Sequence, residues 1–330
     1  MKKVLLTGGA GYIGSHIAVQ LLQSGYEVAI VDNFSTSKPQ IITAIGQITG
    51  KKLDVVAADV RDEAIMSDLF IKNDFYAVVH LAGFKAVGES VAVPLNYYDN
   101  NLICTISLLK AMKKSSCRRI IFSSSATVYG EPDSLPLNEK SPLRPANPYG
   151  RTKLMIEQIL SDLQSSDDSF KIACLRYFNP VASHPSGLID EDPLGIPNNL
   201  FPILMRAARG QMDCLSIFGD DYKTADGTAK RDYIHISDLA DGHLAALKKI
   251  EDIGFDIFNI GTGKSYSVLE VVTEFERALG KSLNKKMQPR RLGDVAEYLA
   301  DVFKAERVLG FKAQKTLSDM CKDAVLNLNK

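Results

Sequence analysis

The sequence lacks any apolar run that approaches the ~20 residues of a membrane-spanning helix. Its basic start, Met1-Lys2-Lys3, is followed by only a short apolar stretch, Val4–Leu6, before Thr7 and two glycines intervene. That stretch is too short for the apolar core of a secretory signal peptide. We therefore expect neither a membrane partner nor secretion.

An excess of charge of either sign is also absent. The chain carries 39 basic and 39 acidic residues, so no large net field draws it to nucleic acid or to an anionic membrane surface. A local basic pocket for a small anion is compatible with this balance. We expect a small-molecule substrate and no nucleic-acid partner.

The cysteines of a disulfide framework or a metal cluster are missing as well. The five cysteines are odd in number, and no two of them stand at metal-ligand spacing (Cys104, Cys117, Cys174, Cys214 and Cys321). Unpaired thiols fit a reducing compartment better than an oxidising one. We therefore predict free thiols, a cytoplasmic location and no metal site.

What the sequence does contain is an alternation of apolar and amphipathic stretches over its first half. We expect strands at Lys3–Thr7, Glu27–Asp32, Leu53–Ala58, Ala77–Ala82, Arg119–Ser123 and Lys171–Tyr177. The helix-length segments between them include Gly14–Gln23, Glu63–Ile71, Asn101–Lys114 and Tyr149–Leu163. Strands joined through helices imply right-handed crossovers and a parallel sheet that is covered on both faces.

The pattern loosens after Phe178. The stretch Asn179–Pro202 holds five prolines and two glycines, which predicts a long loop of the kind that is often functional. The later expected elements are a helix near Ser237–Lys249, a strand near Phe255–Ile260, a helix near Ser267–Ala278 and a helix after Thr316. A chain of 330 residues exceeds the roughly 250–300 residues over which one core keeps growing, so we expect a smaller second lobe.

Three glycines, Gly8, Gly11 and Gly14, follow the first expected strand and open the first expected helix. Their spacing allows a tight turn, a close approach of backbone to a pyrophosphate, and helix N-terminal N–H groups that face the anion. The triplet is a weak signal alone, but here it has the strand–turn–helix context that the motif requires. It predicts an α/β fold, with a Rossmann-type doubly wound parallel sheet as the NAD-binding domain over residues 1–178. Residues 179–330 are expected to form mainly a substrate-binding α/β lobe, with some segments returning to the first domain.

Asp32 ends the second expected strand, about 20 residues beyond the glycines, where an acid accepts the ribose hydroxyls of NAD. A carboxylate there repels the 2′-phosphate of NADP, so NAD is the favoured cofactor. The alternative is a turn in which Asp32 and Asn33 are the turn formers. Asp59, at the end of the third expected strand, either reaches the adenine edge or caps the next helix.

Tyr149 and Lys153 stand one helical turn apart, so both project from the same face of an expected helix. A phenol has a pKa of about 10 and is a poor base at neutral pH. A cationic lysine one turn away and the positive nicotinamide ring both favour the phenolate. Tyr149 can then deprotonate an alcohol while hydride leaves the same carbon.

A Tyr-x-x-x-Lys pair alone is common on solvated helices, but a serine triplet precedes this one. Ser123-Ser124-Ser125 ends the fifth expected strand, at the carboxyl edge where open α/β sheets bind ligands. A hydroxyl there can hydrogen-bond the reacting oxygen. The glycine loop, the serines and the Tyr–Lys pair together form an ordered set that predicts NAD-dependent chemistry at an alcohol carbon.

Six segments match the pattern of a known family over essentially the full length of the chain. They are Thr7–His16, Ala82–Ser90, Tyr97–Asn101, Phe122–Gly130, Leu175–Pro180 and Arg231–His235. With them the chain resembles the extended short-chain dehydrogenase/reductase family and, within it, the UDP-hexose 4-epimerases. The resemblance implies an NAD-dependent isomerase that interconverts UDP-galactose and UDP-glucose, and a homodimer formed through a helix bundle.

The resemblance also implies roles for individual residues. Catalysis is expected from Ser125, Tyr149 and Lys153, with Ser125 chosen by its place before Ala126. The residues implied to line the cofactor site are Gly8, Gly11, Tyr12, Ile13, Gly14, Asp32, Asn33, Ser37, Asp59, Val60, Leu81, Ala82, Lys85, Asn100, Ser123, Tyr149, Lys153, Tyr177 and Pro180. Those implied to surround the UDP-sugar are Lys85, Ser125, Tyr149, Asn179, Asn199, Leu200, Ser216, Phe218, Arg231, Tyr233, Arg291, Asp294 and Tyr298.

Several of these residues suit a nucleoside diphosphate on physical grounds. The guanidinium groups of Arg231 and Arg291 match phosphate oxygens with paired donors, and Phe218 can form a wall for uracil. The alternatives are a surface ion pair between Arg231 and Asp232, and a core position for Phe218. Ser216 departs from the small apolar residue that is usual there, and we expect a backbone contact at that position.

Three other functions compete with this interpretation. Related 4,6-dehydratases place a carboxylate pair just after the strand-end hydroxyl, where this chain has Ala126-Thr127. Epimerases of N-acetylated sugars need space beside the sugar 2-substituent, which the resemblance places next to Tyr298. A non-catalytic NAD sensor typically loses the Tyr–Lys pair, which is present here.

Two histidines near the expected cofactor site are interpreted as packing residues. His80 lies inside an apolar strand, where a hydrogen-bonded core histidine is more common than a ligand. His16 follows the glycine loop and is expected to pack there. Neither has metal-ligand neighbours at a useful spacing.

Overall fold

The computed structural model describes residues 1–193, 195, 197, 199–291 and 293–329 of the chain. Its central feature is a parallel sheet of seven strands in the order β3-β2-β1-β4-β5-β6-β10. These strands are β1 (Lys3–Thr7), β2 (Glu27–Asp32), β3 (Asp54–Ala57), β4 (Phe75–His80), β5 (Arg119–Ser125), β6 (Lys171–Tyr177) and β10 (Phe255–Ile260). The predicted α/β class and doubly wound parallel sheet are confirmed.

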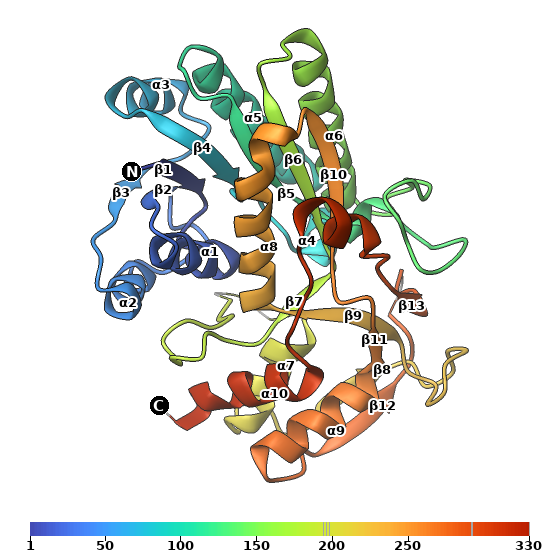
Figure 1. Cartoon of the computed structure of the whole chain (residues 1–330). Helices are drawn as coiled ribbons and strands as arrows, with labels where there is room; N and C mark the ends of the chain where they lie inside the picture. The colour runs from blue at the N-terminus through green and yellow to red at the C-terminus, as the bar shows by residue number, and fades with distance from the viewer. Residues whose placement is uncertain (194, 196, 198, 292, 330) are drawn as a thin grey trace.

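Helices cover both faces of this sheet, as Figure 1 shows. One face carries α1 (Tyr12–Gln23), α2 (Gln40–Thr49) and α8 (Ile236–Lys249). The other carries α3 (Glu63–Lys72), α5 (Pro94–Lys113) and α6 (Pro148–Ser166), with the short α4 (Val87–Ala92) beside α5. Apolar side chains fill both interfaces, which explains why the strands read as continuous apolar runs.

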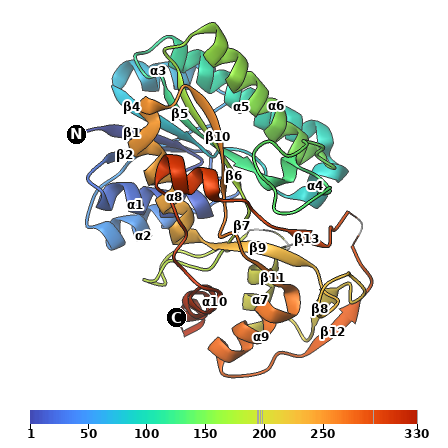
Figure 2. The ribbon, with the colours of Figure 1, turned by 45° about the vertical axis from the view of Figure 1, so that its right-hand side comes forward.

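A smaller lobe lies beyond the carboxyl ends of the strands, and Figure 2 shows it below the sheet. It has its own apolar core. Its helices are α7 (Leu200–Ala208), α9 (Val268–Leu279) and α10 (Leu317–Val325). Its strands are β7 (Asn179–Val181), β8 (Leu215–Phe218), β9 (Lys230–His235), β11 (Ser265–Ser267), β12 (Lys285–Gln288) and β13 (Glu297–Tyr298). Short helical turns lie at Ala126–Val128, Ile250–Asp252, Ala305–Leu309 and Leu326–Asn329.

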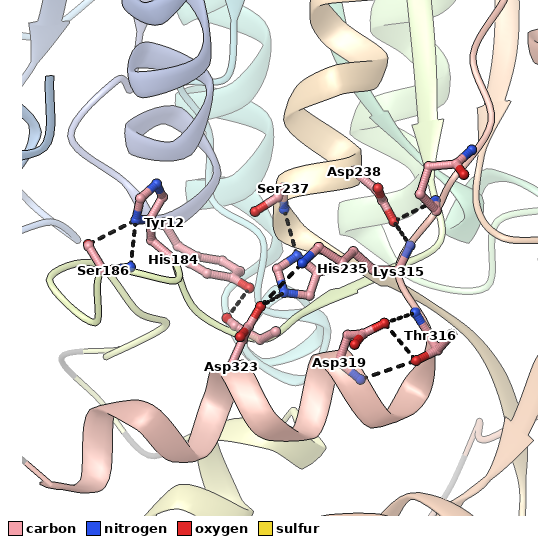
Figure 3. A network of polar contacts seen from close by, with 12 residues as sticks. Tyr12, His184, Ser186, His235, Ser237, Asp238, Lys315, Thr316, Asp319 and Asp323 are labelled. Atoms are coloured by element: carbon pink, nitrogen blue, oxygen red, sulfur yellow. Dashed lines mark hydrogen bonds and ion pairs between the residues drawn. The ribbon is translucent and has the colours of Figure 1, made fainter.

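Polar contacts tie the last helix of the chain to β9 and α8 (Figure 3). His235 Nε2 lies 3.1 Å from Asp323 Oδ2 on α10, and the Ser237 N–H donates to His235 Nδ1 at 3.0 Å. Asp238 on α8 accepts the N–H of Lys315 at 2.9 Å. These contacts place α10 against the strand that carries Arg231.

The expected elements differ from the observed ones mainly at their ends. The strand expected at Ala77–Ala82 lies at Phe75–His80, and the N–H of Leu81 makes the last bond to β1, to Thr7 O at 3.1 Å, before the chain leaves the sheet. The expected loop Asn179–Pro202 begins with β7 and ends inside α7. Pro202 fits the first turn of α7 because the N–H groups there have no helical partner to lose. Residues 194, 196 and 198 of that loop lie outside the described residues.

No helix among the described residues is long and apolar enough to cross a bilayer. All five cysteines are free thiols, as predicted, and four of them are buried.

Candidate active site

The glycine loop joins β1 to α1 and leaves no space for side chains. Gly8 has a φ of 69°, and a Cβ there would lie 2.8 Å from the backbone nitrogen of Ala82. A Cβ on Gly14 would lie 2.5 Å from the carbonyl oxygen of Gly8. Gly11 caps α1 without a side-chain hydrogen bond, so the first-turn N–H groups face outward. This is a cradle for a pyrophosphate at a helix N-terminus.

Asp32 lies at the carboxyl end of β2, beside this cradle, and is buried. Its carboxylate accepts the N–H of Ala10 at 3.0 Å, the N–H of Phe34 at 2.9 Å and the hydroxyl of Ser37 at 2.9 Å. Three bonds leave one of the roughly four lone-pair sites of a carboxylate for a ligand hydroxyl. Asp32 therefore shapes the loop after β2 and also retains capacity for a ribose.

Asp59, just beyond the end of β3, forms a polar cluster with Asn33 and Arg61. Arg61 donates to both carboxylate oxygens of Asp59, at 3.1 and 2.9 Å, and the amide of Asn33 donates at 3.1 Å. The bonds with Arg61 hold the pKa of Asp59 down to about 2. The alternative role of Asp59 as the cap of the next helix is wrong, because Asp62 caps α3 through the N–H groups of residues 64 and 65.

The chain after β4 brings further predicted residues toward the glycine loop. The N–H groups of Leu81 and Ala82 donate to Thr7 Oγ1 at 3.2 and 3.3 Å. Val60 is buried in the core on the α3 side.

Ser125, Tyr149 and Lys153 converge where β5 ends and α6 begins. Asn147 starts α6 by accepting the N–H of Gly150 at 2.8 Å, which places Tyr149 in the first turn. Lys153 Nζ lies 5.8 Å from the ring centroid of Tyr149 and donates to Ser123 O at 2.6 Å. The Ser125 hydroxyl acts on the Tyr149 phenol, whose pKa it lowers. The predicted serine, tyrosine and lysine are therefore adjacent in space.

The charge around Tyr149 has a source that the sequence pattern did not predict. Burial raises the pKa of Tyr149, whereas the hydroxyl of Ser125 and the positive charge of Lys85 lower it. Burial also lowers the pKa of Lys153 to about 8, against the opposing charge of Glu157. Lys85 is thus a second cation near the phenol, besides Lys153.

Lys85 is held by a residue that sequence reasoning missed. Its ammonium lies 2.9 Å from Glu191 Oε1, which also accepts the side-chain amide of Asn199 at 3.0 Å. Glu191 Oε2 is buried with no hydrogen-bond partner in the described part of the chain. The loop between β7 and α7 gave no motif that would have identified Glu191.

The start of the smaller lobe brings Asn179 and Pro180 on β7 next to the sheet edge. Tyr177, the last residue of β6, bonds His243 Nε2 at 2.5 Å, and β7 follows directly. Tyr12, in the first turn of α1, donates its hydroxyl to Ala182 O at 2.7 Å. The glycine-loop helix and β7 are therefore joined directly.

A second missed residue, Asn101, organises the other side of the site. Its side chain bonds the N–H and the carbonyl of Phe84 at 2.8 and 3.1 Å and the hydroxyl of Thr152 at 3.0 Å. The predicted Asn100 donates to Asn101 Oδ1 at 3.0 Å. Two adjacent asparagines in a helix were the available signal, and only the first was chosen.

The arginines predicted for the diphosphate lie together in the smaller lobe. Arg291 Nε donates to Asp294 Oδ2 at 2.9 Å, and Arg231 Nη2 lies 3.9 Å from Asp294 Oδ1. Asp232 instead accepts the N–H groups of Thr262 and Gly263, so the alternative of a surface pair between Arg231 and Asp232 is wrong. The two guanidinium groups share one carboxylate, that of Asp294.

The remaining predicted substrate residues lie on β8, β9, β13 and α7 of the smaller lobe. Phe218 on β8 is half-buried, with its ring centroid 5.2 Å from the Arg291 guanidinium, so it is not a core residue. Tyr298 on β13 pairs with Arg231 on β9 and donates its hydroxyl to Gly130 O. Of the others, Ser216 lies on β8, Tyr233 on β9 and Leu200 at the first position of α7.

Both histidines interpreted as packing residues are buried. His80 bonds Thr7 Oγ1 at 2.7 Å and Thr105 Oγ1 at 3.0 Å, so both of its ring nitrogens have partners. His16 packs edge-on against Tyr12. The described residues contain no group of three side chains suited to a metal ion.

Comparison with known proteins extends the similarity beyond single motifs. Residues 5–324 match the family model of GDP-mannose 4,6 dehydratase. The UDP-glucose 4-epimerase of Bacillus subtilis (strain 168) is 52% identical over 322 residues, which cover 97% of this chain and 95% of that protein.

Two solved structures superpose on nearly the whole chain. A UDP-glucose 4-epimerase from Bifidobacterium longum, in complex with NAD+ and UDP, has a TM-score of 0.96 and 50% identity, covering 99% of this chain and 98% of that one. One from Stenotrophomonas maltophila, with bound NAD and formylated UDP-arabinopyranose, has a TM-score of 0.97 and 45% identity, covering 100% and 98%. The similarity therefore includes the sheet and the smaller lobe.

Proposed function

This chain belongs to the UDP-glucose 4-epimerase family, and from that premise we propose that it interconverts UDP-galactose and UDP-glucose. The observation that carries the proposal is the adjacency of Ser125, Tyr149 and Lys153 at the carboxyl edge of the sheet. The arginines Arg231 and Arg291, which share Asp294, support a diphosphate on the facing lobe. The enzyme is an isomerase with NAD as its cofactor.

The residues of the first domain fit NAD. The glycine cradle and the open N-terminus of α1 suit a pyrophosphate, and the spare capacity of Asp32 suits the ribose. When bound, NAD supplies the acceptor and donor of the hydride at C4 of the hexose. We assign residues 1–178 to cofactor binding and residues 179–330 mainly to the substrate, with α8 and β10 returning to the sheet.

In the proposed mechanism, Tyr149 removes the proton from the 4-hydroxyl of the sugar and later returns it to the C4 oxygen, when the opposite face of C4 is presented for the return of the hydride. Ser125 hydrogen-bonds the same oxygen, and the charge of Lys85 favours the phenolate. Lys153, whose ammonium lies 5.8 Å from the centre of the Tyr149 ring, adds a second positive charge nearby. The 4-keto sugar turns about its link to the diphosphate between the two proton transfers. Arg231 and Arg291 hold the diphosphate, so remote binding energy retains the intermediate while the hexose moves.

The two competing enzymatic functions are less well supported. Elimination by a 4,6-dehydratase needs an additional acid and base beside the ketone, and Thr127 stands where the related dehydratases have a carboxylate. The Thr127 hydroxyl donates to Ser125 Oγ at 3.0 Å, so it supports the epimerase serine instead. Tyr298 supports UDP-hexoses over N-acetylated sugars because a bulky ring borders the sugar 2-substituent.

The experiment that tests the function uses UDP-galactose deuterated at C4. Epimerisation through a 4-keto sugar predicts UDP-glucose that retains the deuterium at C4, because the hydride never leaves the site. A 4,6-dehydratase would instead produce a 4-keto-6-deoxy sugar. Loss of the label to solvent during conversion would contradict the proposed mechanism.

We further propose a cytoplasmic homodimer. The five free thiols support a reducing compartment. Exposed apolar side chains on α5 and α6, namely Ile103, Ile106 and Met155, support a helix–helix interface between two copies. Sedimentation analysis should give twice the mass of the chain, and a monomer at micromolar concentration would rule out the dimer.

A further inference from the structure

A buried ion pair joins β6 to α6, close to the serines at the end of β5. Arg176 on β6 donates to both carboxylate oxygens of Glu157 on α6, from Nε at 2.9 Å and from Nη2 at 2.6 Å. The side chains of the two residues are 1% and 3% exposed. A pair this deeply buried is weak evidence of a stabilising role, since desolvation offsets much of the attraction.

The pair is connected to the catalytic serines through Ser124. The hydroxyl of Ser124 donates to Glu157 Oε1 at 2.5 Å, and Ser124 is the register partner of Arg176 across the strands. Because side chains alternate along a strand, Ser124 faces α6 between Ser123 and Ser125. The carboxylate of Glu157 thereby fixes the strand end on which Ser125 stands.

The pair also stands next to Lys153. Glu157 follows Lys153 by one helical turn, so their side chains are neighbours on one face of α6. Lys153 donates to Ser123 O, the residue before Ser124. The carboxylate of Glu157 supports the charged form of Lys153 against burial.

We propose that Glu157 and Arg176 are positioning residues for the epimerisation, which hold the end of β5 against α6 and keep the charge of Lys153 in place beside Tyr149. This inference rests on the proposed function of the same site. The carboxylate of Glu157 supplies the negative charge that stabilises the ammonium of Lys153. The guanidinium of Arg176 partly offsets that negative charge. Neither residue touches the substrate.

The other titratable groups around α6 do not produce the same effect. They are His80 on β4, Tyr97 on α5, Tyr129 after β5, Cys174 and Tyr177 on β6, and Asp256 on β10. Burial lowers the pKa of His80 and raises the pKa of the three tyrosines and of Cys174, so these five keep one charge state near neutral pH. Asp256 and Glu89, which bonds Tyr97, are carboxylates at the margin of the group.

The test compares two variants that remove opposite charges from the pair. Glu157→Gln removes the negative charge, so the pH at which Tyr149 and Lys153 lose their protons should fall by on the order of one unit. Arg176→Met removes the positive charge, so the pKa of Tyr149 and the pKa of Lys153 should both rise by a similar amount. The readouts are the pH profile of kcat for UDP-galactose and the ultraviolet absorbance of tyrosinate in the holoenzyme, with Tyr149→Phe as the blank.

A merely structural pair predicts a different result. Both variants would then lose activity in proportion to stability, and the pH profiles would stay in place or move in the same direction, which would overturn the proposal. Glu157→Asp keeps the negative charge, so its pH profile of kcat should lie where the wild-type profile lies. The tyrosinate titration does not require turnover, so it separates failure of this inference from failure of the proposed function, which wild-type conversion of UDP-galactose tests first.

Ser124→Ala decides the question if the charge variants do not fold. It keeps both charges and removes only the hydroxyl that connects β5 to Glu157. Looser placement of Ser125 should lower kcat about 3- to 10-fold, with an unchanged KM for UDP-galactose. An unchanged kcat would overturn the proposal.

Discussion

At the scale of single residues, the site depends on a phenol that its surroundings pull in two directions. Burial raises the pKa of Tyr149, and Ser125 and Lys85 lower it, so the residue can take and return a proton. Tyr149→Phe keeps the ring and removes the hydroxyl. We expect kcat for UDP-galactose to fall by about 10² to 10⁴-fold with KM nearly unchanged. Tyr26→Phe, at the opposite edge of the sheet before β2, should leave both constants unchanged.

Tyr298 is expected to decide which sugars enter. Tyr298→Ser opens space beside the sugar 2-substituent and removes the hydrogen bond to Gly130 O. The variant should turn over UDP-N-acetylgalactosamine at least ~10-fold faster than the wild type. Tyr266→Ser is the matched control, because Tyr266 pairs with Arg231 from the other side of β9. Equal rates for the Tyr298 variant and the wild type would remove Tyr298 from the specificity account.

The residues that the sequence predicted are those whose partners are close in the chain. Tyr149 and Lys153 are one turn apart, and Ser125 ends an apolar strand. Short-range sequence patterns were therefore sufficient to predict all three residues. Glu191 was missed because its partner, Lys85, lies 106 residues away in the chain. Glu157 was missed because its partner, Arg176, lies on a different element, β6, and no motif connects the two. A single sequence does not show which distant carboxylate pairs with which cation.

At the scale of elements, strands β1, β2 and β6 begin and end where the apolar runs predict. Helix α2 was not predicted because its sequence contains Gly46 and several β-branched residues, which have low helix propensity. Its stability comes instead from packing Ile45 against α1 and the sheet. The short strands of the smaller lobe were missed for the converse reason, since each forms only through pairing with a distant segment.

The loops that support β9 depend on Asp232. Its carboxylate accepts the N–H groups of Thr262, Gly263 and Ala300 at 2.8, 2.9 and 3.3 Å. In Asp232→Asn an NH2 group replaces one carboxylate oxygen, and it cannot accept the backbone N–H groups that it faces. The variant should lose about 1–3 kcal/mol of unfolding free energy. Because Arg231 is the adjacent residue, KM for UDP-galactose should rise as well.

A matched control separates stability from substrate binding. Asp238→Asn breaks a similar set of bonds, to the N–H groups of Gln314 and Lys315, away from the arginines. It should lower the urea midpoint without raising KM. If both variants raise KM equally, Asp232 has no particular connection to the substrate site.

At the scale of the whole molecule, the arrangement of the two lobes follows from connections that no local pattern shows. The chain leaves the sheet after β6, forms part of the smaller lobe, and returns as α8 and β10 before leaving again. The sequence predicted a return but not its position. Pairing of β10 with β6 and packing of α8 on α1 were needed to define it.

Buried histidines make the stability of the molecule depend on pH. Burial lowers the pKa of His16 and His80 to about 3 and that of His243 to about 4. Below a pH of about 6.5, the ordinary pKa of histidine, the unfolded chain binds protons that the folded chain does not. The free energy of unfolding therefore falls as the pH is lowered from about 6.5 to about 3–4. Each histidine should cost on the order of 2 kcal/mol at pH 5.

One buried acid opposes this trend. Burial raises the pKa of Asp232 to about 6, so the folded state gains a proton there first as the pH falls. Burial also raises the pKa of Asp190 and Asp241, whose side chains are less buried than that of Asp232. The three histidines outweigh these carboxyls, so urea unfolding of the holoenzyme should show a lower midpoint at pH 5 than at pH 7. A midpoint that is equal or higher at pH 5 would show that these histidines are protonated in the folded state.

The most direct test of the central claim is conversion of UDP-galactose by the purified protein without added NAD, followed by chromatographic detection of UDP-glucose. We predict steady conversion, because the cofactor is regenerated in every turnover and is retained during purification. Absence of UDP-glucose even after NAD is supplied would contradict the account, and would direct attention to N-acetylated sugars and to 4,6-dehydration.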